Sequence, residues 1–163
     1  MTDHLHTLST PLGPMLLCAS DAGLRGAWFV GQRHFPDLTA PPVSRQAPSH
    51  PVLSASCTQL AEYFDGQRQP FTLPLDLSHG TPFQQQVWQA LLSIAWGQTA
   101  RYGHLAQRLG RPQAARAVGM AVGRNPVSII VPCHRVLGAD GSLTGYAGGL
   151  DRKQDLLHRE GVL

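Results

Sequence analysis

The sequence predicts two structural units, an α/β unit in the N-terminal half and a mainly α unit containing a helix-turn-helix in the C-terminal half. Short apolar runs separated by turns fill residues 7–30, whereas helical periodicity dominates from residue 81 onward. The charge balance changes at the same place: residues 1–79 hold four Lys or Arg against six Asp or Glu, and residues 80–163 hold nine against four. We therefore expect domains at residues 1–78 and 79–163.

In the first unit, residues 7–30 predict a β-hairpin or meander. A turn rich in proline and glycine precedes a short apolar strand at Met15–Ala19, and a second turn leads into a strand at residues 24–30. Cys18 lies inside the first of these strands, so we interpret it as a core residue.

The rest of the first unit alternates between loop, helix and strand signals. Residues 31–50 hold several prolines and no periodicity, which is typical of a loop. Apolar residues at helical spacing predict a helix over residues 52–64. Residues 71–77 alternate as a short strand, which Pro74 restricts to a sheet edge or bulge. Residues 78–80 are interpreted as a linker.

The second unit begins with three helix signals. Thr81 and Pro82 are typical of an N-cap and a first helical residue, and the helix is predicted to run to about Trp96. A short helix over residues 101–109 and a helix over residues 113–122, rich in Ala and Gly, follow. The order is the outline of a helix-turn-helix. The slim third helix suits either a narrow groove or close packing against another helix.

Three further features complete the second unit. Asp140 and Gly141 predict a hairpin-type turn. The glycine-rich segment over residues 142–149 is predicted to be a loop able to fold over a flat ligand. Residues 150–159 predict an amphipathic helix, which is followed by Glu160.

Composition restricts the class of protein. Three cysteines, at positions 18, 57 and 133, form no closely spaced pair, which favours a reducing compartment. The N-terminus lacks the layout of a signal peptide, and no apolar run is long enough to span a membrane. We expect a soluble, cytoplasmic protein without a membrane partner. The basic second half favours a polyanionic partner such as nucleic acid, or else is a solvated surface.

The candidate nucleophile lies in residues 129–136 (IIVPCHRV). The β-branched run predicts a buried strand that Pro132 ends, and Cys133 follows with His134 and Arg135 directly after it. Nearby positive charge or a base lowers the pKa of a thiol, so Cys133 is a candidate thiolate nucleophile. The alternative is an inert buried cysteine.

On these residues the sequence resembles the O6-alkylguanine–DNA alkyltransferases, which take an alkyl group from guanine onto a cysteine. The resemblance covers residues 81–161, about half the chain, and more loosely the N-terminal half through residues 10–13 (TPLG). It implies an RNase H-like ribbon with a helix in the first domain and a mainly α, winged helix-turn-helix second domain. The matching segments are residues 115–119 (ARAVG), 125–126 (NP), 131–136 (VPCHRV), 145–149 (GYAGG) and 158–161 (HREG).

The resemblance implies a suicide reaction, a single-turnover methylated-DNA–protein-cysteine S-methyltransferase. Cys133 would accept the alkyl group, His134 would act as a base through a water molecule, and Glu160 would orient His134. Tyr102 would give a proton to N3 of the departing guanine. Asn125 would tie the recognition helix to the active-site strand through backbone hydrogen bonds.

The resemblance also assigns the surroundings of the lesion. The nucleotide must be flipped out of the stack, and Arg116 would fill the gap in the duplex. Some relatives carry serine where this chain has Ala147, so only a backbone donor remains there. The expected base pocket comprises Val122, Val136, Tyr146, Ala147 and Gly148. The expected DNA-binding residues are Ala115, Arg116, Ala117, Gly119, Arg124 and Arg135.

The resemblance also indicates the partner of this protein and its alternative classes. We expect double-stranded DNA containing alkylated guanine as the partner, no cofactor, and a monomer. Some family members bind zinc in the first domain, but this chain lacks that ligand set, so we predict no metal. The main alternative is an alkyltransferase-like protein that binds lesions without transfer, which Cys133 opposes. A winged-helix regulator would not explain the VPCHRV segment, and a cysteine hydrolase would turn over repeatedly.

Overall fold

A computed structural model describes residues 3–37, 43–46, 50–68 and 70–163. The chain forms two compact units, Met1–Leu77 and Ser78–Leu163. The expected boundary, between residues 78 and 79, lies one residue beyond the division between these units. No helix among the described residues is both long enough and apolar enough to cross a membrane.

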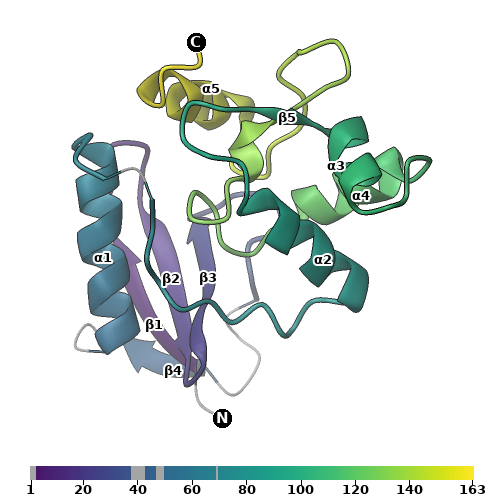
Figure 1. Cartoon of the computed structure of the whole chain (residues 1–163). Helices are drawn as coiled ribbons and strands as arrows, with labels where there is room; N and C mark the ends of the chain where they lie inside the picture. Colours follow the sequence, from purple (N-terminus) through teal and green to yellow (C-terminus); the bar gives the residue numbers. More distant parts are fainter. Residues whose placement is uncertain (1–2, 38–42, 47–49, 69) are drawn as a thin grey trace. The chain divides into compact units, whose positions relative to one another are not determined.

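The first unit is a four-stranded sheet with one helix against it (Figure 1). The strands are β1 (Asp3–Leu8), β2 (Met15–Ser20), β3 (Gly23–Phe29) and β4 (Val43–Gln46), in the order β3-β2-β1-β4. The first three form an antiparallel meander, and β4 pairs parallel with β1. Every residue of β2 is buried, which explains its apolar run from Met15 to Ala19.

Helix α1 (Pro51–Phe64) packs on this sheet. The ring nitrogen of His50 accepts a hydrogen bond from the backbone N–H of Val52 and so caps the first turn. The apolar stripe predicted from the sequence is buried at Leu53 and Leu60, whereas Cys57 on that stripe is half-buried; Tyr63, which was not expected there, is buried as well. The predicted α/β unit is therefore confirmed.

Two expectations for this unit are wrong. Strand β4 lies within the segment predicted to be a loop. Its four residues show no alternation of apolar and polar side chains, so the sequence does not indicate that they pair parallel with β1. The strand expected over residues 71–77 is reduced to an isolated bridge between Leu24 and Leu75. Two backbone hydrogen bonds surround that bridge. The N–H of Leu24 donates to the carbonyl of Pro74 at 2.8 Å, and the N–H of Asp76 donates to the carbonyl of Leu24 at 2.9 Å.

The second unit contains the predicted helices. Helix α2 (Pro82–Leu91) starts with a full capping box between Thr81 and Gln84. It ends well before Trp96, because residues 92–97 turn away from the helix axis. There the N–H groups of Ser93 and Ile94 donate to the carbonyls three residues earlier in the chain, as in a tight turn. A two-residue strand β5 (Ala100–Arg101) then leads into α3 (Tyr102–Arg108) and α4 (Ala115–Gly123).

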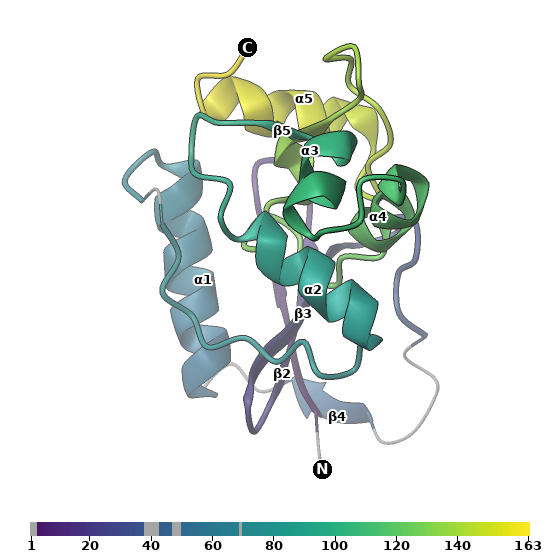
Figure 2. The same cartoon turned by 45° about the vertical axis from the view of Figure 1, so that its right-hand side comes forward.

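Helices α3 and α4 lie side by side in both views (Figure 1 and Figure 2). The sharp turn between them begins at Gly110, whose φ is 71°, a left-handed conformation that favours glycine. Helix α4 also packs on α2, where the indole N–H of Trp88 donates to the carbonyl of Ala121 at 2.9 Å. This confirms the helix-turn-helix outline and places Trp88 in the core.

The chain then passes through a 3-10 turn η1 (Cys133–Arg135), strand β6 (Val136–Leu137) and helix α5 (Leu150–Arg159). Strand β6 pairs parallel with β5, through Ala100 with Val136 and Arg101 with Leu137. This small ribbon joins the segment after Cys133 to the start of α3.

Candidate active site

The segment that carries Cys133 is a series of turns, so the predicted buried strand is wrong. Residues 127–131 are buried but adopt turns, and Ile129 has a φ of 74°. Positive φ is rare for a β-branched residue and costs on the order of 1–3 kcal/mol. The apolar run predicted burial correctly, but burial does not distinguish a strand from a compact loop.

Asn125 holds this loop in shape. Its Nδ2 donates to the carbonyl oxygen of Val131 at 2.8 Å, and its Oδ1 accepts from the N–H of Val127 at 2.9 Å. Both backbone groups are buried; the N–H of Val127 has the Asn125 oxygen as its partner, and the carbonyl of Val131 also accepts from the N–H of Cys133 at 2.8 Å. Because Asn125 directly follows the end of α4, these two hydrogen bonds connect the helix-turn-helix to the turn before Cys133.

Cys133 starts the turn η1 and is 7 % exposed. Burial raises the pKa of the Cys133 thiol to about 11, although the Asn125 side chain, the Lys153 charge and the cysteine's own N–H oppose that rise. The sequence led us to expect a lowered pKa. The resting group is therefore a thiol, and a base must accept its proton when sulfur reacts.

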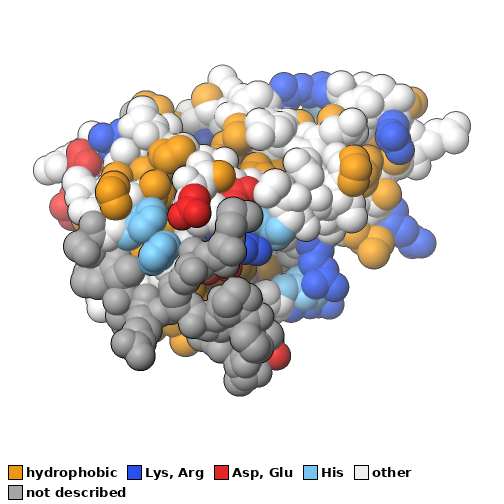
Figure 3. Space-filling model, turned by 90° about the horizontal axis from the view of Figure 1, so that it is seen from below, with side chains coloured by type: hydrophobic (Ala, Val, Ile, Leu, Met, Phe, Trp, Pro, Cys, Tyr) orange, Lys and Arg blue, Asp and Glu red, His pale blue; other side chains and the backbone are white. Residues whose placement is uncertain are grey.

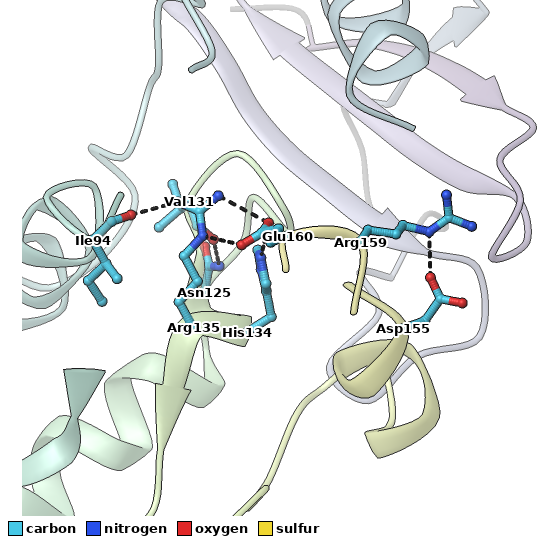
Figure 4. A network of polar contacts seen from close by, with 8 residues as sticks. All are labelled: Ile94, Asn125, Val131, His134, Arg135, Asp155, Arg159 and Glu160. Carbon is cyan, nitrogen blue, oxygen red and sulfur yellow. Dashed lines mark hydrogen bonds and ion pairs between the residues drawn. The ribbon is translucent and has the colours of Figure 1, made fainter. Parts of the chain in front are cut away.

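His134 is fully buried and is oriented by Glu160 (Figure 4). Its Nε2 lies 2.7 Å from Oε2 of Glu160, a residue 26 positions later at the end of α5. A carboxylate only accepts hydrogen bonds, so the proton is on Nε2 and the lone pair is on Nδ1. Nδ1 is buried and has no hydrogen-bond partner. Burial lowers the pKa of His134, so the ring is neutral and able to accept a proton.

Arg135 is the main correction to the predicted site. We expected it to bind DNA, but it is 6 % exposed and directed into the protein. Its Nε and Nη2 donate to the two carboxylate oxygens of Glu160, at 2.6 and 3.0 Å, and its Nη1 donates to the carbonyl of Ile94 at 2.6 Å. A guanidinium held on three sides in this way is not available to a phosphate.

Lys153 is a residue that sequence reasoning missed. It is fully buried on α5, and its Nζ donates to the carbonyls of Val136 and Thr144, each at 2.6 Å, and more weakly to Gly145 at 3.4 Å. Burial lowers the pKa of Lys153 to about 8, while Cys133 raises it. A signal was present: Lys153 precedes Leu156 and Leu157 by three and four residues, so it lies on the apolar stripe of its helix.

The glycine-rich loop brings Tyr146 close to the cysteine. Its hydroxyl is buried, and burial raises the pKa of Tyr146 well above its ordinary value, with a further contribution from Cys133. The Ser128 side chain partly offsets this rise, though its contact falls short of a regular hydrogen bond. Ala147 is half-buried and Gly148 is buried in the same loop, and both expected pocket walls, Val122 and Val136, are buried as well.

The outward face of α4 is slim and basic. Arg116, Ala117 and Arg124 are exposed, and Ala115 and Gly119 are half-buried. Gly119 faces α3, where a Cβ at this position would lie 3.5 Å from the ring of the half-buried Tyr102. Met120 is 71 % exposed, a large apolar side chain on this face that sequence reasoning did not single out. Its position among small residues was the available signal.

Two histidines of the first unit lie in ring contact. The rings of His4 and His50 lie 4.7 Å apart, and histidine side chains in contact are visible on the face drawn in Figure 3. Among the described residues there is no group of three or more His, Cys, Asp or Glu that could hold a metal ion. These histidines therefore give no support for a bound metal.

A helix-turn-helix followed by a buried cysteine and a buried His–Glu pair indicates a DNA-binding enzyme that uses a cysteine. Two family descriptions match the chain: "6-O-methylguanine DNA methyltransferase, DNA binding domain" over residues 82–162, and "6-O-methylguanine DNA methyltransferase, ribonuclease-like domain" over residues 4–77. The chain belongs to the 6-O-methylguanine DNA methyltransferase family.

The sequences of several relatives match nearly the whole length of this chain. The methylated-DNA–protein-cysteine methyltransferase of Mycobacterium tuberculosis is 45% identical over 157 residues, covering 96% of this chain and 92% of the relative. The enzyme of the same name from Salmonella typhimurium is 44% identical, covering 96% and 94%. The crystal structure of the M. tuberculosis protein in complex with DNA matches with a TM-score of 0.83 at 43% identity, over 96% of this chain and 92% of that one.

Proposed function

We propose that this protein repairs DNA by moving the alkyl group of O6-alkylguanine irreversibly onto Sγ of Cys133. The observation that carries the proposal is the buried His134–Glu160 pair directly after Cys133 in the chain, in which Nδ1 of the imidazole is buried and has no hydrogen-bond partner. Membership of a family of DNA methyltransferases supports the same reaction. Double-stranded DNA is the partner, in keeping with the relative solved in complex with DNA.

The reaction is an in-line displacement at the alkyl carbon. The Cys133 proton passes to Nδ1 of His134 through a water molecule, and Glu160 stabilises the imidazolium through its hydrogen bond to Nε2. Sulfur forms a bond to carbon as the bond from carbon to O6 breaks. Tyr102 gives a proton to N3 of the departing base, so guanine leaves without a negative charge. The thioether has no route back, so each molecule reacts once.

The lesion reaches the buried thiol only after its nucleotide leaves the base stack. Helix α4 enters the minor groove with its small residues, which allow close approach, and Arg116 fills the gap in the duplex. The loop with Tyr146, Ala147 and Gly148 covers the flipped base, and Val122 and Val136 line the pocket. O4-alkylthymine is a second possible substrate of the same pocket.

The test is a mass spectrum of the protein after incubation with an oligonucleotide containing O6-methylguanine. We expect a gain of one methylene per chain on the peptide that contains Cys133, with uptake stopping at one equivalent. Continued turnover would instead identify a hydrolase. Tight lesion binding without any mass gain would identify a recognition protein whose cysteine is idle.

A pair of variants assigns the acceptor. Cys133→Ser should show no mass gain and still bind the alkylated duplex, because the hydroxyl is a far weaker nucleophile and adds little bulk. Cys57→Ser, which changes a half-buried cysteine of α1, should react like the unaltered protein. Transfer by Cys133→Ser at the normal rate would overturn the assignment.

A further inference from the structure

Arg135 and Glu160 form a fork-to-fork ion pair in the interior of the second unit. The side chain of Arg135 is 7 % exposed and that of Glu160 is fully buried. Two of the three hydrogen bonds from the guanidinium go to the two oxygens of one carboxylate, and the third goes to the carbonyl of Ile94 after α2. This bidentate geometry fixes the plane of the carboxylate as well as its distance, which a single hydrogen bond would not do.

Glu160 shares one oxygen between two donors. Oε2 accepts from Nε2 of His134 and from Nη2 of Arg135, whereas Oε1 accepts from Nε of Arg135 (Figure 4). The orientation of the imidazole therefore depends on the carboxylate, and that of the carboxylate depends on the guanidinium. Arg135 is next to His134 in the chain, so one short turn supplies both the base and the group that orients its partner.

We infer that Arg135 is a positioning residue for the alkyl transfer: it keeps Glu160 ionised and oriented, so that His134 stays neutral with its lone pair on Nδ1. Without a cation beside it, a buried carboxylate shares or takes up a proton more readily, and the His134–Glu160 pair then no longer accepts one from Cys133. This inference rests on the alkyl transfer proposed above.

The surrounding charges are few and can be named. His134 faces Glu160 at the end of α5, Arg135 in its own turn and Lys153 on α5; the pKa of His134 is lowered by burial first and by the two cations, and raised by Glu160. Removing the Arg135 charge increases the proton affinity of the His134–Glu160 pair, whichever of the two groups takes the proton. The direction of the effect on a pH profile is therefore fixed.

The experiment measures the single-turnover rate constant for transfer from free O6-benzylguanine to Cys133 between pH 5 and pH 9. A free base avoids any contribution from DNA binding. For Arg135→Met we expect the acidic limb of the pH–rate profile to move to higher pH by about one unit or more, together with a lower plateau. A purely structural role would lower the plateau and leave the limb in place, and that result would overturn the inference.

Two further variants keep the test decisive. Arg135→Lys retains the charge, so the acidic limb of its pH–rate profile should stay near that of the unaltered protein. Lysine cannot bond to both carboxylate oxygens and the Ile94 carbonyl together, so the plateau of the rate constant should fall about tenfold. If Arg135→Met does not fold, the lysine variant decides: an undiminished plateau would refute the positioning role. Arg159→Met removes the arginine of a more exposed pair with Asp155 on α5 and should change neither quantity.

Failure of the two proposals is distinguishable. If the unaltered protein takes up no benzyl group, the alkyl transfer itself is wrong. If it reacts normally and Arg135→Met shows an unshifted acidic limb, only the role of Arg135 is wrong.

Discussion

The carboxamide of Asn125 bonds to the loop on both of its sides, donating to the carbonyl of Val131 at 2.8 Å and accepting from the N–H of Val127 at 2.9 Å. Together with the backbone hydrogen bonds from Val131 to Val127 and from Ile130 to Ser128, these two bonds close the loop that precedes Cys133 and contains Ile129 at positive φ. One side chain just after α4 therefore contributes to the position of Cys133.

Asn125→Ala is expected to destabilise the fold by about 1–3 kcal/mol, because the buried N–H of Val127 loses its partner, while the carbonyl of Val131 keeps the hydrogen bond from the N–H of Cys133. Urea unfolding measures the change. Gln89→Ala, an exposed position on α2, should stay within about 0.5 kcal/mol of the unaltered protein. Equal stability of the two variants would show that the Asn125 clamp is dispensable.

Stability should fall between pH 9 and pH 11 because of Cys133. The pKa of its thiol is 9.0 when unperturbed and about 11 in the fold. Below pH 9 both states keep the proton; above it the unfolded chain ionises first, so stability decreases by about 1.4 kcal/mol per pH unit. The difference in unfolding free energy between the unaltered protein and Cys133→Ala should be flat below pH 9 and slope downward above it. A constant difference up to pH 11 would contradict the raised pKa.

Lys153→Met should make the Cys133 thiol harder to ionise. The cation opposes the rise of the thiol pKa, so its removal raises that pKa further and slows labelling of Cys133 by iodoacetamide at pH 9. The loop at Thr144 and Gly145 also loses its tether, which faster amide hydrogen exchange would reveal. Gln154→Met, at the next and exposed position of α5, serves as the control; equal labelling rates in both variants would remove Lys153 from the electrostatics of the site.

Arg116→Ala should impair repair of duplex DNA far more than reaction with free O6-benzylguanine. Filling the gap in the stack offsets part of an unstacking cost of a few kcal/mol, so a loss of about tenfold or more is expected on duplex and little change on the free base. Single-turnover kinetics on both substrates measure this. Equal losses on both would exclude a role in base flipping.

Gly119→Ala and Gly110→Ala should change stability in opposite directions. A Cβ at Gly119 meets only the Tyr102 ring, at an ordinary 3.5 Å, and alanine favours a helix interior over glycine by up to about 1 kcal/mol. Gly110 has a φ of 71°, where alanine is strained despite the open space. Thermal unfolding should place the two variants on either side of the unaltered protein; a destabilised Gly119→Ala would mean that α4 and α3 pack more tightly than the structure indicates.

The sequence was most informative where its signals are local. Helical periodicity and the cap at Thr81 predicted α1, α2 and α5. The pairing of His134 with Glu160 was expected only from the family resemblance. The predictions that were wrong concern features whose partners lie far away in the sequence. The parallel strand β4 and the inward direction of Arg135 are determined by β1 and by Glu160, and nothing beside them in the sequence indicates those contacts. The prediction for the loop before Cys133 failed for another reason. Its β-branched residues favour a strand, but the Asn125 bonds and the backbone bonds within the loop produce a turn instead.

The indole of Trp88 provides an optical probe of this protein. It is 2 % exposed, lies against Gly80 at the start of the second unit, and donates its N–H to the carbonyl of Ala121 on α4. Indole emission responds to the loss of such a hydrogen bond and to the entry of water. Movement of α4 away from α2, whether caused by DNA or by a filled pocket, is therefore expected to change the fluorescence without any attached label.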